Sequence, residues 1–251
     1  MTILDLTLAE IALIAVTALG AQIVGGIAGY GTGLLMPLVL VPVIGAEAIV
    51  PVISLSAILT NATRVVVFRE SLDIRKALLI SAFAVPTTVL GAYCYTLLSS
   101  RGAALVIGSM LIAIVPLRRY LARAKFTLGT KGGAAAGVVY GFLTGGTTGV
   151  GVLLISMLMA MGLSGMQVIA TDALTSVILG LTKSGVFIAA GALPPKLWLV
   201  AFLIGGMATP GAMAAKWMAR RFSAKLHDTM IEGTILAGGA MLIWGALKAA
   251  G

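Results

Sequence analysis

The stretch GGIAGYGTG, residues 25–33, lies inside a long apolar region, and a second stretch, GFLTGGTTGVG, residues 141–151, lies inside another. Glycine weakens a helix, and non-helical backbone at membrane depth is tolerated only where protein buries it or a watery cavity borders it. The two stretches therefore predict two equivalent breaks in membrane-embedded helices, an arrangement typical of transporters.

The composition is that of an integral membrane protein. Of the 251 residues, 60% are hydrophobic and 10% are charged, and the mean hydropathy is +1.12. A soluble domain carries about 25% charged residues, whereas charge here is confined to short islands. The net charge of +9 comes from Lys and Arg at the ends of apolar runs, without interleaved aromatic residues, so no nucleic-acid partner is expected.

The apolar segments predict an all-α polytopic membrane protein with about five helical elements in each half. The second element of each half is shorter than the roughly 20 residues needed to cross a bilayer, which predicts broken or re-entrant helices near the membrane midplane. The predicted elements are residues 6–24, 33–45, 48–68, 76–98, 102–117, 132–146, 150–162, 166–191, 197–217 and 230–247.

The two halves, residues 1–120 and 121–251, are predicted to be repeats within one membrane domain. A shift of 120 residues superimposes the two glycine stretches and also places Gly91 on Gly211. Together with the matched order of segments, these coincidences favour an internal repeat.

Basic residues predict the orientation, because Lys and Arg favour cytoplasmic loops. The segment count then places equivalent loops of the two halves on opposite sides, as expected for an inverted-topology repeat in the plasma (inner) membrane. The basic loops, predicted to be cytoplasmic, are residues 69–76, 118–131 and 216–225.

The two glycine breaks predict an anion site. The helices that begin near them present free backbone N–H groups at their positive ends, and neighbouring hydroxyls can donate to oxyanion oxygens. An alternative reading is that these glycines only let helices pack closely. The substrate-binding candidates at the breaks are Gly29, Tyr30, Gly31, Thr32, Gly33, Thr147, Thr148, Gly149 and Gly151, with Thr144 as a further hydroxyl.

Ionisable residues inside apolar segments are functional candidates. Lys183 is placed to neutralise a bound anion, and Asn61 with Arg64 shares a helix face that can offer an amide and a cation. Alternatively, the Arg64 side chain extends to the lipid headgroups at the inner face of the membrane. Asp172 is a candidate carrier of a coupling proton. The alternative is a structural role, in which Asp172 caps a neighbouring helix. It lies 11 residues from Lys183, about 16 Å along a helix, so the two cannot pair directly.

The motifs resemble the TauE/SafE family of sulfite and organosulfonate exporters. The resemblance rests on GYGTG, residues 29–33, followed by LLMP, on the second glycine stretch, and on ATDAL, residues 170–174, which is similar to the family's ATSAL. It implies a secondary transporter of two related halves that moves a small sulfur-containing or carboxylate anion by alternating access. Asp172 stands where the family commonly has Ser, which favours proton coupling or a different substrate charge.

Other classes are also open. A passive anion channel or uniporter would use the same glycine turns and cations, and a membrane scaffold would leave Lys183 without a role. The pattern GLSG, residues 162–165, matches intramembrane serine proteases, but His227, the single histidine, lies in a charged stretch away from any apolar helix. We therefore expect no enzyme activity. Cys94 is the single cysteine, and no cluster of Cys, His or carboxylates has metal-ligand spacing. We therefore expect neither a metal nor another cofactor.

Overall fold

The computed structural model describes residues 6–28, 32–123, 126–218, 236 and 239–248. This part of the chain is helical, as predicted. The helices are α1 (Leu8–Ala28), α2 (Thr32–Ile44), α3 (Ile49–Val67), α4 (Ile74–Thr96), α5 (Ser100–Arg123), α6 (Thr130–Gly146), α7 (Gly151–Ala160), α8 (Met166–Ala189), α9 (Pro195–Gly206), α10 (Ala208–Met218) and a short apolar helix, Gly239–Lys248, with a 3-10 turn η1 (Arg69–Ser71) between α3 and α4.

Helix lengths agree with a multi-pass membrane protein. Within the described residues, four helices are long and apolar enough to span a bilayer: Ile49–Val67, Ile74–Thr96, Ser100–Leu121 and Met166–Ala189. The helices that follow the glycine breaks are short, with 13 residues in α2 and 10 in α7. Both fall below the roughly 20 residues of a full span, so re-entry of these two helices stays our prediction.

The sequence predicted one segment over residues 197–217, but the structure has two helices, α9 and α10, which meet at Met207. Gly205 and Gly206 end α9, and Pro210 follows in the first turn of α10. Glycine weakens a helix, and proline has no N–H to bond the carbonyl four residues earlier, so a break between them is expected. The segment predicted over residues 230–247 lies mostly outside the described residues.

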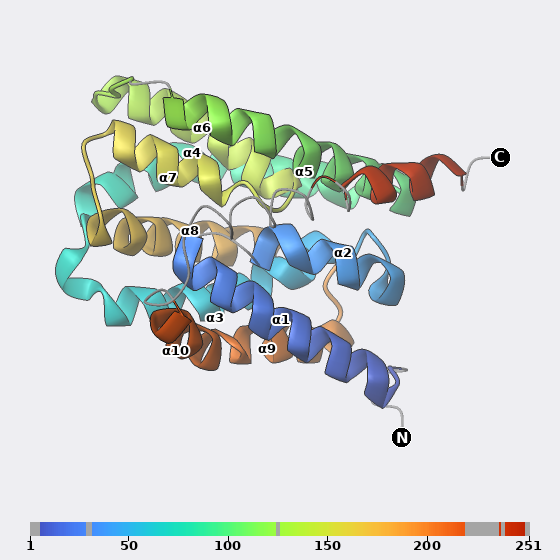
Figure 1. Cartoon of the computed structure of the whole chain (residues 1–251). Coiled ribbons are helices and arrows are strands. Elements are labelled where there is room, and N and C mark those ends of the chain that lie inside the picture. Colours follow the sequence, from blue (N-terminus) through green and yellow to red (C-terminus); the bar gives the residue numbers. More distant parts are fainter. Residues whose placement is uncertain (1–5, 29–31, 124–125, 219–235, 237–238, 249–251) are drawn as a thin grey trace.

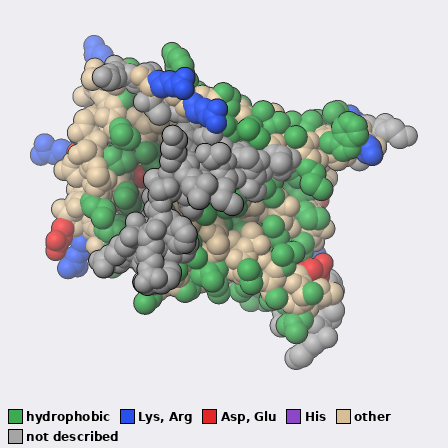
Figure 2. All heavy atoms as spheres, in the orientation of Figure 1, with side chains coloured by type: hydrophobic (Ala, Val, Ile, Leu, Met, Phe, Trp, Pro, Cys, Tyr) green, Lys and Arg blue, Asp and Glu red, His purple; other side chains and the backbone are tan. Residues whose placement is uncertain are grey.

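The helices pack in an order that places α3 and α8 at the centre of the molecule (Figure 1). The pair α3 and α8 packs together; α4 packs on α8 and carries α6 on its other side, while α9 packs on α3, and α1 packs against α9 and α10. Most charged side chains seen in Figure 2 lie toward the end of the molecule at which α6 and α8 begin, and hydrophobic side chains are spread over much of the rest of the described surface in this view. That pattern suits a surface in lipid.

Close packing of α4 on α6 depends on glycines at every fourth position. Gly137, Gly141 and Gly145 of α6 face the backbone of α4, and a methyl group on Gly141 would collide with the carbonyl oxygen of Ala84. Thr88 donates a hydrogen bond across this contact to the Gly141 carbonyl at 3.0 Å. Small residues with this spacing let membrane helices approach closely.

One pair of contacts supports the predicted repeat. A methyl group on Gly91 would collide with the Phe142 carbonyl of α6, and a methyl group on Gly211 would collide with Gln22 of α1. A shift of 120 residues carries Gly91 onto Gly211 and Gln22 onto Phe142. The same contact between the two halves thus occurs twice, with the roles of the halves exchanged. The repeat boundaries, residues 1–120 and 121–251, remain a proposal.

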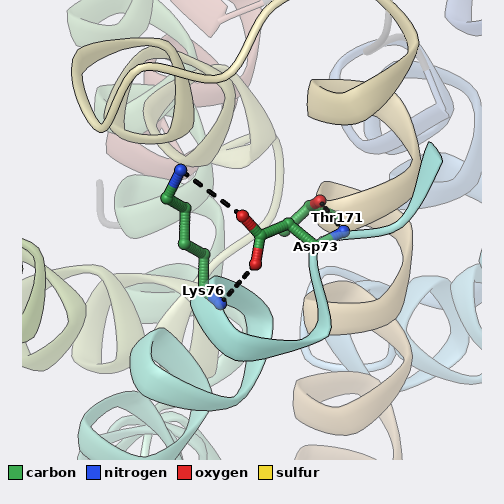
Figure 3. Close-up of polar contacts among 3 residues, drawn as sticks. All are labelled: Asp73, Lys76 and Thr171. Carbon is green, nitrogen blue, oxygen red and sulfur yellow. Dashed lines mark hydrogen bonds and ion pairs between the residues drawn. The ribbon is translucent and has the colours of Figure 1, made fainter.

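The start of α4 is fixed to the first turns of α8 (Figure 3). Asp73, the N-cap residue, accepts a hydrogen bond from the backbone N–H of Lys76 at 3.0 Å and forms an ion pair with the Lys76 ammonium at 3.4 Å. The backbone N–H of Asp73 donates to Thr171 Oγ1 of α8 at 3.1 Å. The turn between α3 and α4 and the beginning of α8 therefore lie at the same end of the molecule.

Replacing Asp73 tests this cap. The hydrogen bond from the Lys76 backbone N–H holds the pKa of the Asp73 carboxyl below its ordinary 3.8. Since the folded pKa is depressed, the cap contributes fully above pH 3.8 and its contribution is lost as the pH falls through the folded pKa. We expect Asp73→Ala to lower the free energy of unfolding by about 1 kcal/mol at neutral pH. Thermal unfolding in detergent measures this, with Glu70→Ala, in the exposed turn η1, as control; equal stability of the two variants would contradict it.

Candidate functional site

The two glycine breaks meet in the folded chain, although they are 120 residues apart. Thr148 Oγ1 donates a hydrogen bond to the Gly33 carbonyl at 3.0 Å. A β-carbon on Gly33 would lie 2.9 Å from the Gly149 nitrogen, and Gly149 has φ +84°, which favours glycine. The N-termini of α2 and α7 therefore lie side by side, as predicted.

A cavity of about 140 Å³ lies beside this junction. Its volume is below the roughly 300–1,000 Å³ of sites for drug-sized ligands, so it suits a small solute. Its walls come from α2, α3, α6, α7 and α8. The site residues predicted from the sequence that line it are Thr32, Gly33, Asn61, Arg64, Thr144, Thr147, Thr148, Gly149, Gly151, Asp172 and Lys183. The remaining candidates, Gly29, Tyr30 and Gly31, lie outside the described residues.

Lys183 of α8 is 8% exposed, and its ammonium donates a hydrogen bond to the Thr144 carbonyl at 3.0 Å. Thr144 lies in the last turn of α6, where carbonyls lack partners within the helix and carry partial negative charge. The ammonium thus stabilises this helix end. It has three N–H donors, of which this bond uses one, so two remain for a ligand.

Asp172 and Thr147 bring unsatisfied polar atoms to the cavity. Asp172 is 6% exposed and Thr147 is 4% exposed, and neither Asp172 Oδ1 nor Thr147 Oγ1 has a hydrogen-bond partner. Buried polar atoms are normally paired, so two unpaired atoms in one cavity indicate a place for solvent or ligand. The Asp172 Oδ1 atom therefore does not cap a neighbouring helix.

The α3 wall holds the other predicted polar groups. Arg64 is half-buried in the last turn of α3 and lines the cavity. Asn61 donates from Nδ2 to the Ala57 carbonyl of its own helix at 2.9 Å, which leaves one N–H for a ligand. Gln22 of α1 donates to Thr60 Oγ1 at 3.0 Å and so ties this wall to α1.

Sequence reasoning missed several residues of the cavity wall. Ser176 lies one turn after Asp172 on the face of α8 that also carries Leu179, Gly180 and Lys183; Tyr140 lies one turn before Thr144 on α6. Four-residue spacing from a polar candidate was the signal that could have found them.

The glycines of the two stretches differ in their surroundings. Gly141 and Gly145 pack against the backbone of α4, whereas Gly33, Gly149 and Gly151 line the cavity. Helix packing thus accounts for Gly141 and Gly145, whereas an anion-binding role for the glycines that line the cavity stays a prediction.

The protease pattern does not form a site in the described residues. Ser164 is exposed in the turn between α7 and α8 and does not line the cavity. Its proposed base, His227, lies outside the described residues.

This fold and site define a class of protein: a helical, multi-pass membrane protein with a small polar cavity between its central helices. The family model for sulfite exporter TauE/SafE matches residues 13–242, nearly the whole chain, so the chain belongs to that family. Membership implies a membrane transporter of sulfite or related anions, and this family consists of transporters rather than enzymes. Comparisons with curated proteins and with solved structures give no match.

Proposed function

We propose that this protein is a secondary transporter of a small anion, such as sulfite, an organosulfonate or a related carboxylate, and that it works by alternating access in the plasma membrane. The observation that carries the proposal is the meeting of both helix N-termini with Lys183 around one cavity. Helix N-termini and a buried ammonium favour negative charge, and the cavity is of the size of a small solute.

In this mechanism the anion lies between the two repeats. The N-termini of α2 and α7, Thr147, Thr148 and Lys183 bind its oxygens, and Arg64 and Asn61 receive it at the end of α3. Movement of residues 1–120 against residues 121–251 then exposes the cavity to one side or the other.

Charge balance favours a proton as the coupling ion. With Arg64, Lys183 and Asp172 all ionised, the cavity carries one net positive charge, which balances a monoanion. A proton on Asp172 raises the net charge to two, which balances a dianion. Binding of the proton and of a doubly charged substrate is therefore mutually favourable.

Loop positions support the predicted orientation. The turn between α3 and α4 bonds to the beginning of α8 through Thr171, and Leu128, just before α6, donates its backbone N–H to the Ala160 carbonyl at the end of α7. Asp73 of the basic loop 69–76 and Leu128 of the basic loop 118–131 therefore lie at the same end of the molecule, beside the turn that joins α7 to α8. Most of the third basic loop, residues 216–225, lies outside the described residues.

Reconstitution in liposomes tests the function. Uptake of labelled sulfite and then of sulfoacetate is measured with and without an inward proton gradient. Accumulation above equilibrium that depends on the gradient is expected. Flux that only equilibrates would indicate the passive channel or uniporter instead, and no flux of any small sulfonate, sulfite or carboxylate would contradict an anion transporter.

Replacing Asp172 tests the coupling. We expect Asp172→Asn to flatten the pH dependence of flux and to abolish accumulation driven by the proton gradient, because the amide cannot exchange a proton. Asp73→Asn, which changes a carboxylate outside the cavity, is the matched control and should keep the parent pH profile. An Asp172→Asn variant with the parent profile would return Asp172 to a structural role.

A further inference from the structure

A second cavity lies at the other end of the central helices. It measures about 620 Å³ and is lined by residues around the turn before α3, the ends of α4 and α8, and the beginning of α9. Glu47 and Lys196 are on its wall. The first cavity uses α3 from Ile53 to Arg64. The second cavity borders the beginning of α3 and the end of α8, whereas the first borders the middle of both helices. The two cavities therefore follow one another along the axes of α3 and α8.

The layer between the cavities is thin and closed. Along α8 it extends from Lys183 in the first cavity to Ala190 in the second, seven residues or about 10 Å. On the α3 side, Ile49, Val50 and Val52 have no exposed surface.

Phe187, in this layer, is the largest fully buried side chain among the described residues. It lies one turn after Lys183 and has no exposed surface. Its ring meets the ring of Tyr95 edge to face, with 5.9 Å between centroids. Tyr95 in turn lines the second cavity, and its hydroxyl donates to the Ala46 carbonyl at 2.7 Å. The aromatic pair thus joins α8, α4 and the turn between α2 and α3 across the layer.

From these contacts we infer that the second cavity is the outer vestibule of the path through the first, and that the Phe187–Tyr95 pair is the barrier that separates them. The inference rests on the proposed transport function. The anion crosses when the edge-to-face contact and the Tyr95 hydrogen bond are broken and α4 and α8 move apart. The predicted repeat adds support: Val67, which corresponds to Phe187 at the opposite end, is 64% exposed, so among the described residues Val67 does not form an equivalent barrier.

Thiol accessibility tests the barrier without knowledge of the substrate, so the result stands whether or not the transport assay succeeds. In a Cys94→Ser background, Ser176→Cys places a thiol in the wall of the first cavity and Thr96→Cys places one in the vestibule. A membrane-impermeant methanethiosulfonate is applied to right-side-out and to inside-out vesicles. We expect Ser176→Cys to react from the Arg64 side and to be protected from the Glu47 side, with the reverse for Thr96→Cys.

Removing the barrier should remove the protection. We expect Phe187→Ala to raise the rate of Ser176→Cys labelling from the Glu47 side by about tenfold, because an aromatic contact that favours the closed state is lost. Phe202→Ala makes the same change at an exposed phenylalanine of α9 and should leave the protection intact. Tyr95→Phe, which deletes only the hydroxyl bonded to Ala46, serves if Phe187→Ala does not fold and should raise the rate in the same direction. Equal labelling from both sides in the parent, or unchanged protection in folded Phe187→Ala and Tyr95→Phe, would overturn the inference.

Discussion

Lys183→Ala is expected to abolish most transport while folded protein is retained. The substitution removes the buried ammonium that lies between the Thr144 carbonyl and the cavity. A hydrogen bond to a charged group contributes about 1.5–3 kcal/mol, so we expect transport at low substrate concentration to fall by about 10- to 150-fold. Lys183→Arg keeps the charge and should retain partial activity, because guanidinium geometry differs from that of an ammonium.

Two further variants separate charge from packing. Lys183→Met keeps the length and volume of the side chain without its charge and should lose transport as Lys183→Ala does. Lys131→Ala removes an exposed lysine in the first turn of α6 and should behave as the parent. Thermal unfolding in detergent reports the folded fraction of each variant. Parent-like flux in Lys183→Met would refute the anion-binding role and leave Lys183 as a partner of the α6 C-terminus alone.

Gly141→Ala is expected to have the largest effect on stability. The added methyl group would collide with the Ala84 carbonyl and with Thr87 Oγ1, so α4 and α6 must separate along their shared face. Overpacking of this kind costs about 1–3 kcal/mol or more, which exceeds the roughly 0.5–1 kcal/mol that alanine gains over glycine in a helix. A lower midpoint of thermal unfolding in detergent is therefore expected.

The matched control is Gly185→Ala in α8, where a methyl group meets no atom within 4 Å. There only the gain in helix propensity remains, so its unfolding midpoint should equal or exceed that of the parent. If both variants unfold at the same temperature, contact between α4 and α6 does not limit stability, and the packing role given to Gly141 is wrong.

The class and the helical segments could be predicted from the sequence because they depend on local properties. Runs of apolar residues define α3, α4 and α8 with ends within two residues of those found, whereas α5 continues to Arg123, six residues beyond the predicted end at residue 117. The break between α9 and α10 was missed, although Gly205, Gly206 and Pro210 signal it. A hydropathy pattern reports burial in lipid over a whole segment and is insensitive to one interrupted turn.

The candidate site was predicted in part. Ionisable and glycine residues such as Lys183 and Gly149 stand out in apolar surroundings because their transfer into a membrane is costly or their helix propensity is low. Tyr140 and Ser176 did not stand out, because a single hydroxyl on a helix is common and acquires meaning only from the helix it faces.

The sequence by itself determined that this chain is a multi-pass helical membrane protein, that it has two glycine-interrupted regions, and which charged side chains lie within apolar segments. These follow from the hydrophobic effect and backbone propensity, which act residue by residue. Only the tertiary structure decided that Gly33 meets Thr148, that Lys183 bonds Thr144, and that the ring of Phe187 packs against the ring of Tyr95. Such contacts join residues far apart in the chain, and they depend on how the helices pack, which no local pattern encodes.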